Sequence, residues 1–190
     1  MTETINIQTH RLIIRQLKLS DLSDFHTYRS NPEVTKYQGF DVMTIEQAET
    51  FIKNNLKKSY GKAGEWVQYG IEKIETKQLI GDCAIKLNQN DTRIAEIGMT
   101  ISHHEQQKGF AKECFIGIVQ HLFNKKNIHR IVETVGAENI ASINLLKSVG
   151  FRQEGYFIEN IFFKRKWGSE YQYAMLKREW DDREYQTNKI

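Results

Sequence analysis

The amino-acid sequence predicts a single domain of mixed α/β class. The chain has 190 residues with one proline and no repetitive stretch, so nothing in it reads as a linker. A chain of this length buries about 70% of its unfolded surface on folding, enough for a core without disulfides or metals. Short runs of β-branched residues alternate with segments in which apolar residues recur at the spacing of a helix. We expect one domain over residues 1–180 and a polar C-terminal tail, residues 181–190, that frays.

The pattern of apolar residues and capping signals sets the order of the elements. Ser20 and Asp21 are placed to cap the first helix, and Thr44 with Gln47 forms a capping box for the second. Asn139 and Gly150 should begin and end the last of the four helices. In chain order we expect a strand region over 5–17, helices over 21–28 and 44–56, strands over 66–71, 79–87 and 94–101, a helix over 109–124, a strand over 131–135, a helix over 139–149, and strands over 156–163 and 171–176.

The segment 94–135 decides the sheet type. Its two strands flank a helix, and the second strand is rich in β-branched residues, which is typical of a buried strand parallel to its predecessor. The two strands before this segment, over 66–71 and 79–87, are joined by a polar turn and are expected to be antiparallel. The sheet is therefore expected to be mixed.

The run from Ala95 to Ala111 carries the strongest functional signal. An apolar strand leads directly into Gln106-x-x-Gly109-x-Ala111 at the start of the next helix. The first turn of a helix has unpaired N–H groups and the positive end of the helix dipole, and a small residue there lets a phosphate approach the main chain. The pattern predicts an anion site that suits a pyrophosphate.

This pattern resembles the pyrophosphate loop, Arg/Gln-x-x-Gly-x-Gly/Ala, of the GNAT superfamily of acetyl-coenzyme A-dependent N-acyltransferases. A later segment is similar to the family's helix that begins at Asn and ends in Gly-Phe. It reads Asn139-x-x-Ser142-x-x-Leu145-Leu146-x-x-Val149-Gly150-Phe151. The start of the chain resembles the branch containing the ribosomal-protein N-terminal (alanine/serine) acetyltransferases. The residues that carry this resemblance are Thr9-x-Arg11-Leu12-x-Ile14-Arg15, followed by Asp21 and Asn31-Pro32-Glu33-Val34. The resemblance spans nearly the whole chain.

The resemblance implies a GNAT-like fold, with a mostly antiparallel, splayed seven-stranded sheet flanked by helices, and acetyl-CoA as co-substrate. Asn139 would bind the pantetheine arm as well as cap its helix. The strand 94–101 would offer backbone groups to the same arm, and the loop would hold the pyrophosphate. The implied cofactor-binding residues are Met99, Thr100, Ile101, Gln106, Gln107, Lys108, Gly109, Phe110, Ala111 and Asn139.

The resemblance also implies two catalytic residues. Glu96 matches an acid that accepts the proton of the amine, directly or through water, although a strand glutamate paired with a lysine is the alternative. Ser142 matches a hydroxyl that assists departure of the coenzyme A thiolate. Many relatives use a tyrosine where this chain has Leu146, so Tyr156 and Tyr173 remain substitutes for Ser142.

Several other chemistries are not favoured. The run His103-His104-Glu105 does not complete a His-Glu-x-x-His zinc motif, because Lys108 stands at the second histidine position, and we expect no metal. Cys114 has no histidine beside it in the sequence and is expected to be a buried, inert thiol. Two cysteines outside any Cys-x-x-Cys pair fit a reducing, cytoplasmic location.

Charge and hydropathy limit the partners. The net charge of +3 arises from nearly balanced acids and bases, which does not suggest a dedicated nucleic-acid binder. No apolar run has membrane length. We expect an enzyme, monomeric or homodimeric, that transfers acetyl from acetyl-CoA directly to a primary amine in a ternary complex. The amine would belong to a protein N-terminus or a small molecule; the alternative is a non-catalytic acyl-CoA-binding or regulatory module of the same fold.

Overall fold

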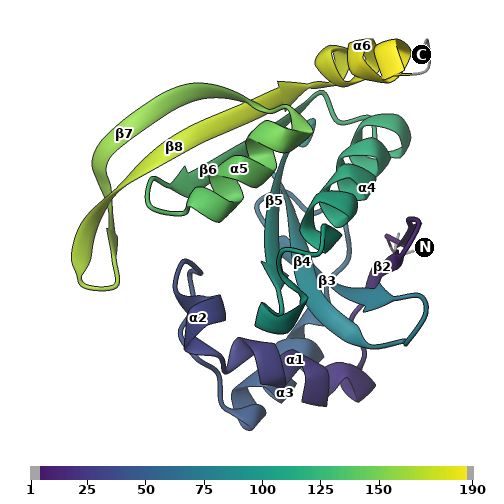
Figure 1. Cartoon of the computed structure of the whole chain (residues 1–190), viewed down its shortest axis with the longest axis vertical. Helices are drawn as coiled ribbons and strands as arrows, with labels where there is room; N and C mark the ends of the chain where they lie inside the picture. The colour runs from purple at the N-terminus through teal and green to yellow at the C-terminus, as the bar shows by residue number, and fades with distance from the viewer. Residues whose placement is uncertain (1–4, 188–190) are drawn as a thin grey trace.

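The computed structural model describes residues 5–187 and consists of one mixed sheet with helices on both faces (Figure 1). The strand order is β1-β2-β3-β4-β5-β6-β8-β7, and β5 and β6 form the parallel pair among antiparallel neighbours. The strands are β1 (Ile7–Gln8), β2 (Leu12–Gln16), β3 (Trp66–Lys73), β4 (Leu79–Leu87), β5 (Ile94–Ile101), β6 (Arg130–Gly136), β7 (Arg152–Phe163) and β8 (Lys166–Leu176). The mixed α/β class is confirmed.

The sheet has eight strands where the family resemblance implied seven. The N-terminal strand region folds back on itself at Thr9, whose Oγ1 accepts a hydrogen bond from the backbone N–H of Leu12 at 3.1 Å. Ile7 then pairs with Ile14, so one expected strand region becomes the two strands β1 and β2. The turn depends on this side-chain contact, which alternating hydropathy does not reveal.

Six α-helices accompany the sheet: α1 (Leu22–Arg29), α2 (Pro32–Thr35), α3 (Ile45–Asn55), α4 (Phe110–Lys125), α5 (Ile140–Val149) and α6 (Lys177–Thr187). The capping box of Thr44 and Gln47 is confirmed at the start of α3. The predicted side-chain cap by Asp21 is wrong: its carboxylate accepts the N–H of Lys18 and pairs with Arg15, both at 2.8 Å. The short helix α2, capped by Asn31, was not predicted.

The expected tail, residues 181–190, is helical as far as Thr187, and residues 188–190 lie outside the described part of the chain. The helix α6 begins at Lys177, and Trp180 on it is 8% exposed. The ring of Trp180 packs against Phe123 of α4, with centroids 6.5 Å apart. The buried tryptophan and the ion pair of Glu179 with Arg152 attach this helix to the body of the protein.

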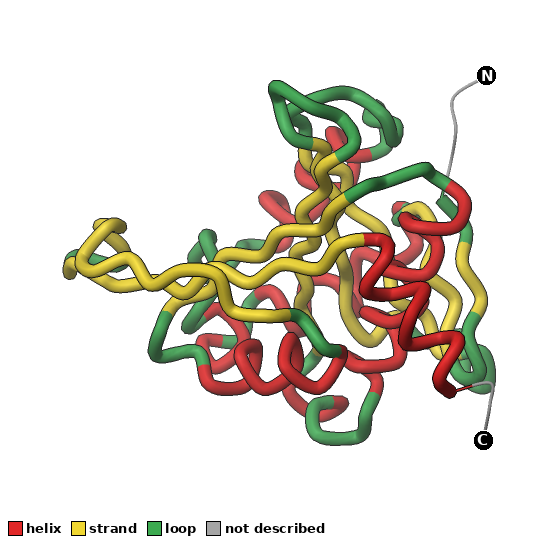
Figure 2. Tube along the Cα trace, turned by 90° about the horizontal axis from the view of Figure 1, so that it is seen from above, coloured by secondary structure: helices red, strands yellow, loops and turns green. Residues whose placement is uncertain are grey.

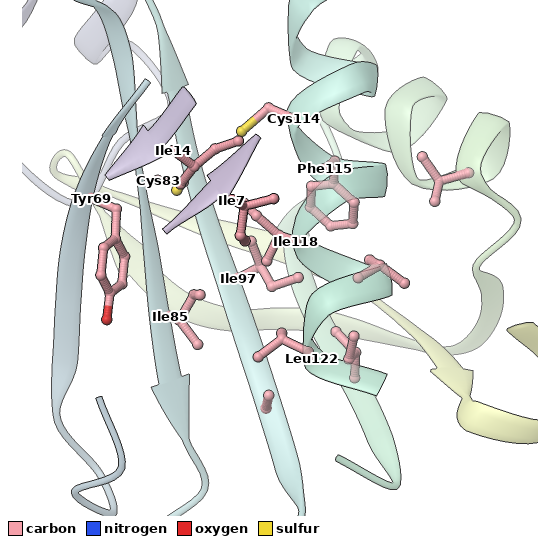
Figure 3. Close-up of a cluster of buried hydrophobic side chains, with 14 of the residues drawn as sticks. Ile7, Ile14, Tyr69, Cys83, Ile85, Ile97, Cys114, Phe115, Ile118 and Leu122 are labelled. Atoms are coloured by element: carbon pink, nitrogen blue, oxygen red, sulfur yellow. The ribbon is translucent and has the colours of Figure 1, made fainter. Parts of the chain in front are cut away.

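The main core lies between α4 and the sheet (Figure 3). Residues at helical spacing on α4, including Phe115, Ile118 and Leu122, meet inward side chains of the strands. The strand β1 approaches α4 closely at Gly117, where an added Cβ would lie 2.8 Å from a methyl group of Thr9. Only glycine fits this approach.

Both cysteines belong to this core. Cys83 and Cys114 are buried and free of disulfides, and Figure 3 shows their side chains turned toward the same region between β4 and α4. Burial raises the pKa of the Cys83 thiol well above its usual value. The expectation that Cys114 is a buried thiol is confirmed.

A second core lies under α1 and α3 and contains a buried ion pair. Arg29 of α1 binds Asp82 of β4 through two hydrogen bonds, at 3.0 and 2.5 Å, and both side chains are at most 2% exposed. Tyr28 donates a third hydrogen bond to Asp82 at 2.7 Å. The ring of Phe40 lies over the guanidinium at 3.9 Å. The pair joins α1, the loop after α2 and the centre of the sheet.

We expect Asp82→Ala to lower the free energy of unfolding by about 3–5 kcal/mol, because it leaves the Arg29 charge buried without its counter-ion. Urea denaturation followed by circular dichroism measures the loss. Glu49→Ala is the matched control, since it breaks an exposed pair with Lys53 and should cost less than about 1 kcal/mol. Equal losses for the two variants would contradict the assignment of Asp82 as the anchor of α1.

Candidate active site

The strands β5 and β6 part soon after they meet, and the site lies where they part. They pair at only two positions, Ile94 with Arg130 and Ala95 with Ile131. Beyond them β5 stays paired with β4 as far as Ile101, so its other edge is open. A cavity of about 600 Å³ fills the opening, lined by β5, β6, α5 and the β7–β8 hairpin.

Glu133 occupies the narrow end of the opening. Its carboxylate accepts a hydrogen bond from the backbone N–H of Ile97 at 2.7 Å, two residues past the last parallel pair, and the residue is 9% exposed. Burial raises the pKa of Glu133 well above its usual value, the hydrogen bond from Ile97 opposes this, and the nearby charge of Glu96 adds to the rise. Glu133 also lines the cavity.

The sequence analysis missed Glu133. A signal was present, because Ile131, Glu133 and Val135 share one face of a strand whose other members on that face are apolar. An acid at an inward position of a buried strand is rare unless it is paired or functional.

The turn for which the sequence predicts an anion site, residues 106–109, lies at the start of α4. Gln107 and Gly109 have left-handed backbone angles, with φ of 61° and 82° respectively. The side chain of Gln106 donates to the carbonyl of Ile101 at 3.1 Å, which fastens the turn to the end of β5. Residues 106–109 are exposed, so the first N–H groups of α4 are accessible to a ligand.

A polar tie fixes this turn to the β1–β2 turn. The carboxylate of Glu113, in the first turn of α4, accepts hydrogen bonds from the Thr9 hydroxyl and from the backbone and Nε of Arg11, each at 2.6 Å. Arg11 Nη1 also donates to the carbonyl of Lys108 at 3.1 Å. Burial opposes ionisation, but these hydrogen bonds outweigh it and lower the pKa of Glu113. The Arg11 guanidinium therefore lies beside Gly109.

Asn139 and Ser142 both reach the cavity from the first turn of α5. The Asn139 side chain accepts the N–H of Ser142 at 3.2 Å, which confirms the predicted cap, and both residues line the cavity. Of the two substitute tyrosines, Tyr156 lines the cavity. Tyr173 is 1% exposed and donates to Gln153 at 3.3 Å, outside the lining.

Glu96 is placed differently from Glu133. It forms an ion pair with Lys86 of β4 at 2.8 Å, its side chain is 32% exposed, and it is not among the residues that line the cavity. Lys86 in turn lies over the ring of Trp66, 4.8 Å from its centroid. The arrangement matches the alternative of a strand glutamate paired with a lysine.

Of the expected pantetheine contacts on β5, Met99 lines the cavity, whereas Thr100 and Ile101 do not. The carbonyl of Met99 accepts a hydrogen bond from Gln38 at 3.2 Å. Thr100 and Ile101 are 4% and 7% exposed and lie between the cavity and the turn. Thr100 and Ile101 nevertheless lie on the part of β5 that connects the cavity with the turn.

The far wall of the cavity is a long hairpin made of β7 and β8. It projects from the body of the protein (Figure 2) and bends toward α2 in Figure 1. Near its tip, Lys164 donates to the carbonyl of Thr35 at 2.7 Å. Tyr156 and Trp167 contribute aromatic rings to the lining while remaining about half exposed. The hairpin and the loop after α2 enclose the cavity on the side away from α4.

No group of three or more His, Cys, Asp or Glu side chains is arranged to hold a metal ion within the part of the chain that the structure describes. None of the helices in residues 5–187 has the length and apolar character needed to cross a membrane.

Comparison with known proteins identifies the family. Residues 11–152 match the model of the acetyltransferase (GNAT) domain. The chain is 32% identical over 177 residues to the uncharacterized N-acetyltransferase YnaD of Bacillus subtilis, covering 93% of this chain and all of that protein. It is 23% identical over 122 residues to the ribosomal protein uS5 alanine N-acetyltransferase of Escherichia coli, covering 64% and 63% of the two chains.

Solved structures agree in fold. The crystal structure of a GNAT-family acetyltransferase from Bacillus anthracis superposes with a TM-score of 0.81 at 28% identity, over 92% of this chain and 99% of that one. Spermidine N-acetyltransferase from Vibrio cholerae, solved with CoA and spermine, has a TM-score of 0.75 at 23% identity, over 89% and 97% of the chains. This chain is an N-acetyltransferase that belongs to the GNAT family.

Proposed function

We propose that this protein transfers the acetyl group of acetyl-CoA to a primary amine, directly and with both substrates bound. The observation that carries the proposal is the cavity between β5 and β6, which opens toward an exposed turn whose backbone angles suit a phosphate. A long ligand with an anionic middle and a narrow reactive end fits this shape. Acetyl-CoA has both features.

The pyrophosphate would bind the backbone N–H groups of residues 107–111, with the Lys108 and Arg11 side chains adding positive charge nearby. The pantetheine arm would then pass Thr100 and Ile101 on β5 and enter the cavity between Met99 and Asn139. The left-handed Gly109 supports this placement, because glycine adopts this angle without strain and adds no side chain between the main chain of the turn and a ligand.

Acetyl-CoA supplies an acyl group that is bound to a good leaving group. For the reaction, the protein must bring the acceptor amine to this group in its unprotonated form. An alkylamine has a pKa of about 10.4 and an α-amino group about 8, so both are mostly protonated at neutral pH. A carboxylate at the narrow end of the gap would accept the proton, and Glu96 is the candidate from the family resemblance. Ser142, with Tyr156 as substitute, would donate to the departing sulfur.

The acceptor would enter the cavity on the side that the hairpin forms. Its walls mix aromatic rings with the acids Glu138, Glu159 and Glu170, which suits a cationic amine presented on a chain. The distant relatives acylate a ribosomal protein N-terminus and spermidine by name, so a protein N-terminus and a small amine are the two candidates. Two free cysteines support a cytoplasmic setting.

An acceptor screen tests the proposal. Purified protein, acetyl-CoA and a thiol-detecting reagent would be combined with spermidine, spermine or short peptides beginning in alanine or serine. Amine-dependent thiol release identifies the enzyme and its acceptor class. Tight binding of acetyl-CoA with no thiol release from any amine would favour the alternative of a non-catalytic acyl-CoA-binding module.

We expect Gly109→Val to weaken acetyl-CoA binding at least about tenfold, measured by calorimetry. A β-branched residue disfavours φ of 82°, and a Cβ there would lie 3.3 Å from Arg11 Nη2. Gly61→Val is the matched control, because Gly61 has φ of 112°, lies in open space and is absent from the cavity lining. Unchanged affinity in Gly109→Val would show that the pyrophosphate binds elsewhere.

Ser142→Ala should reduce kcat about tenfold without abolishing it, since one hydrogen bond to the leaving sulfur is lost while the cavity persists. Steady-state kinetics with the best acceptor measure the effect. Ser148→Ala on the same helix is the control, because its hydroxyl binds the carbonyl of Leu145 at an exposed position. An acetylated enzyme trapped at Ser142 in the absence of amine would replace direct transfer with a covalent route.

A further inference from the structure

We propose that Glu133, and not Glu96, is the catalytic residue that accepts the proton of the attacking amine. The inference rests on the proposed function, because it assigns a role in acetyl transfer. It follows from the position of the carboxylate, from its unsatisfied hydrogen-bonding capacity and from the state of its neighbour Glu96.

The position follows from the shape of the opening. The anion turn lies beyond the C-terminal end of β5, and the two strands converge toward Ala95 and Ile131. A pantetheine arm that enters from the turn therefore carries its acyl end toward the convergence. Glu133 bonds to Ile97 at that end and lines the cavity. The acyl carbon and the nucleophile meet beside this carboxylate.

One carboxylate oxygen of Glu133 is held and the other is available. Oε1 accepts the Ile97 N–H at 2.7 Å, and among the described residues no hydrogen bond to Oε2 is found. An ionised carboxylate oxygen is a hydrogen-bond acceptor, so Oε2 can receive an N–H of the substrate. The hydrogen bond to Ile97 also fixes the side chain, which a general base requires.

The surroundings of Glu133 favour uptake of a proton by its carboxylate. Tyr173 of β8 lies opposite Glu133 in the pairing of β6 with β8. The charged groups that act on Glu133 are Glu96 of β5 and Lys86 of β4. Phe115 of α4 and Leu146 of α5 line the same cavity. This apolar environment raises the pKa of Glu133, so its conjugate acid is closer in strength to the amine. Glu96 instead has its charge compensated by Lys86.

The step balances with one proton moved from nitrogen to sulfur. An amine that arrives as an ammonium first releases one proton to solvent. The nitrogen lone pair then forms the bond to the acyl carbon, the carbon–sulfur bond breaks, and the remaining ammonium proton passes to Glu133. The sulfur leaves as a thiolate that accepts a hydrogen bond from Ser142 or Tyr156 and takes its proton from solvent, and Glu133 returns its proton to solvent through the cavity.

The experiment compares Glu133→Gln with Glu96→Gln, using the acceptor that the parent protein uses. The amide keeps an oxygen for the Ile97 N–H but cannot accept a proton. We expect Glu133→Gln to lose kcat about 100-fold or more at pH 7 while acetyl-CoA affinity changes less than about threefold. The part of the acidic limb that reports Glu133 should disappear from its pH–rate profile, which leaves the part set by protonation of the amine. Glu96→Gln should keep that limb and most of the rate.

Two further measurements separate a chemical role from a structural one. Glu133→Ala should regain part of its activity when formate is added, because the small carboxylate fits the vacated space. Independently of activity, the urea midpoint of Glu133→Gln should rise relative to the parent protein as pH increases from the ordinary carboxylate pKa through the raised value of Glu133. Ionising this buried group destabilises the parent over that window, and glutamine has no charge to ionise.

Each result decides the inference. Overlaid pH–rate profiles for Glu133→Gln and the parent, or loss of the limb in Glu96→Gln instead, would overturn it while leaving acetyl transfer intact. Loss of acetyl-CoA binding in Glu133→Gln would assign the residue a purely structural role and also overturn it. A parent protein that binds acetyl-CoA but acetylates no amine would overturn the proposed function, and this inference with it.

Discussion

The structure depends on a parallel pairing that stops after two residue pairs. Strands β5 and β6 meet at Ala95 and Ile131 and then separate, which leaves backbone groups of β5 without a strand partner in the middle of the sheet. Buried backbone N–H groups need acceptors, and Glu133 supplies one to Ile97. The rest of the open edge faces a cavity. The fold tolerates this opening because α4 and α5 cover one face and because β4 and β8 hold the outer edges of the two strands.

Two polar clusters position the elements around the opening. Glu113 ties the start of α4 to the β1–β2 turn and so fixes the anion turn relative to the sheet. The buried pair of Arg29 and Asp82 fixes α1 to the centre of β4 on the opposite face. A buried ion pair such as that of Arg29 and Asp82 contributes little net stability compared with apolar residues of the same size. Their geometry is specific, which suits sites where the position of a turn matters more than the strength of its attachment.

Local signals in the sequence predicted much of the fold. The capping box of Thr44, the Asn139 cap and the left-handed Gly150 all involve residues a few positions apart, and each is present as expected. The failures involve side chains that bind outside their own helix. Asp21 binds Arg15 instead of capping its helix, and α6 is attached through Trp180 and Glu179. Glu133 escaped notice because its importance comes from Ile97, 36 residues away, across a gap that no local pattern encodes.

The two sides of the cavity are built in different ways, and this difference bears on specificity. On the side of the anion turn, the elements are joined through the apolar core between α4 and the sheet and through the Glu113 tie. On the other side, a projecting hairpin and the loop after α2 are held by long polar side chains such as Lys164 and Gln38, each bonded to a backbone carbonyl. Such contacts contribute about 1 kcal/mol each and depend little on the sequence of the partner segment. Substitutions on the hairpin can therefore change this side of the cavity while the side next to α4 keeps its geometry.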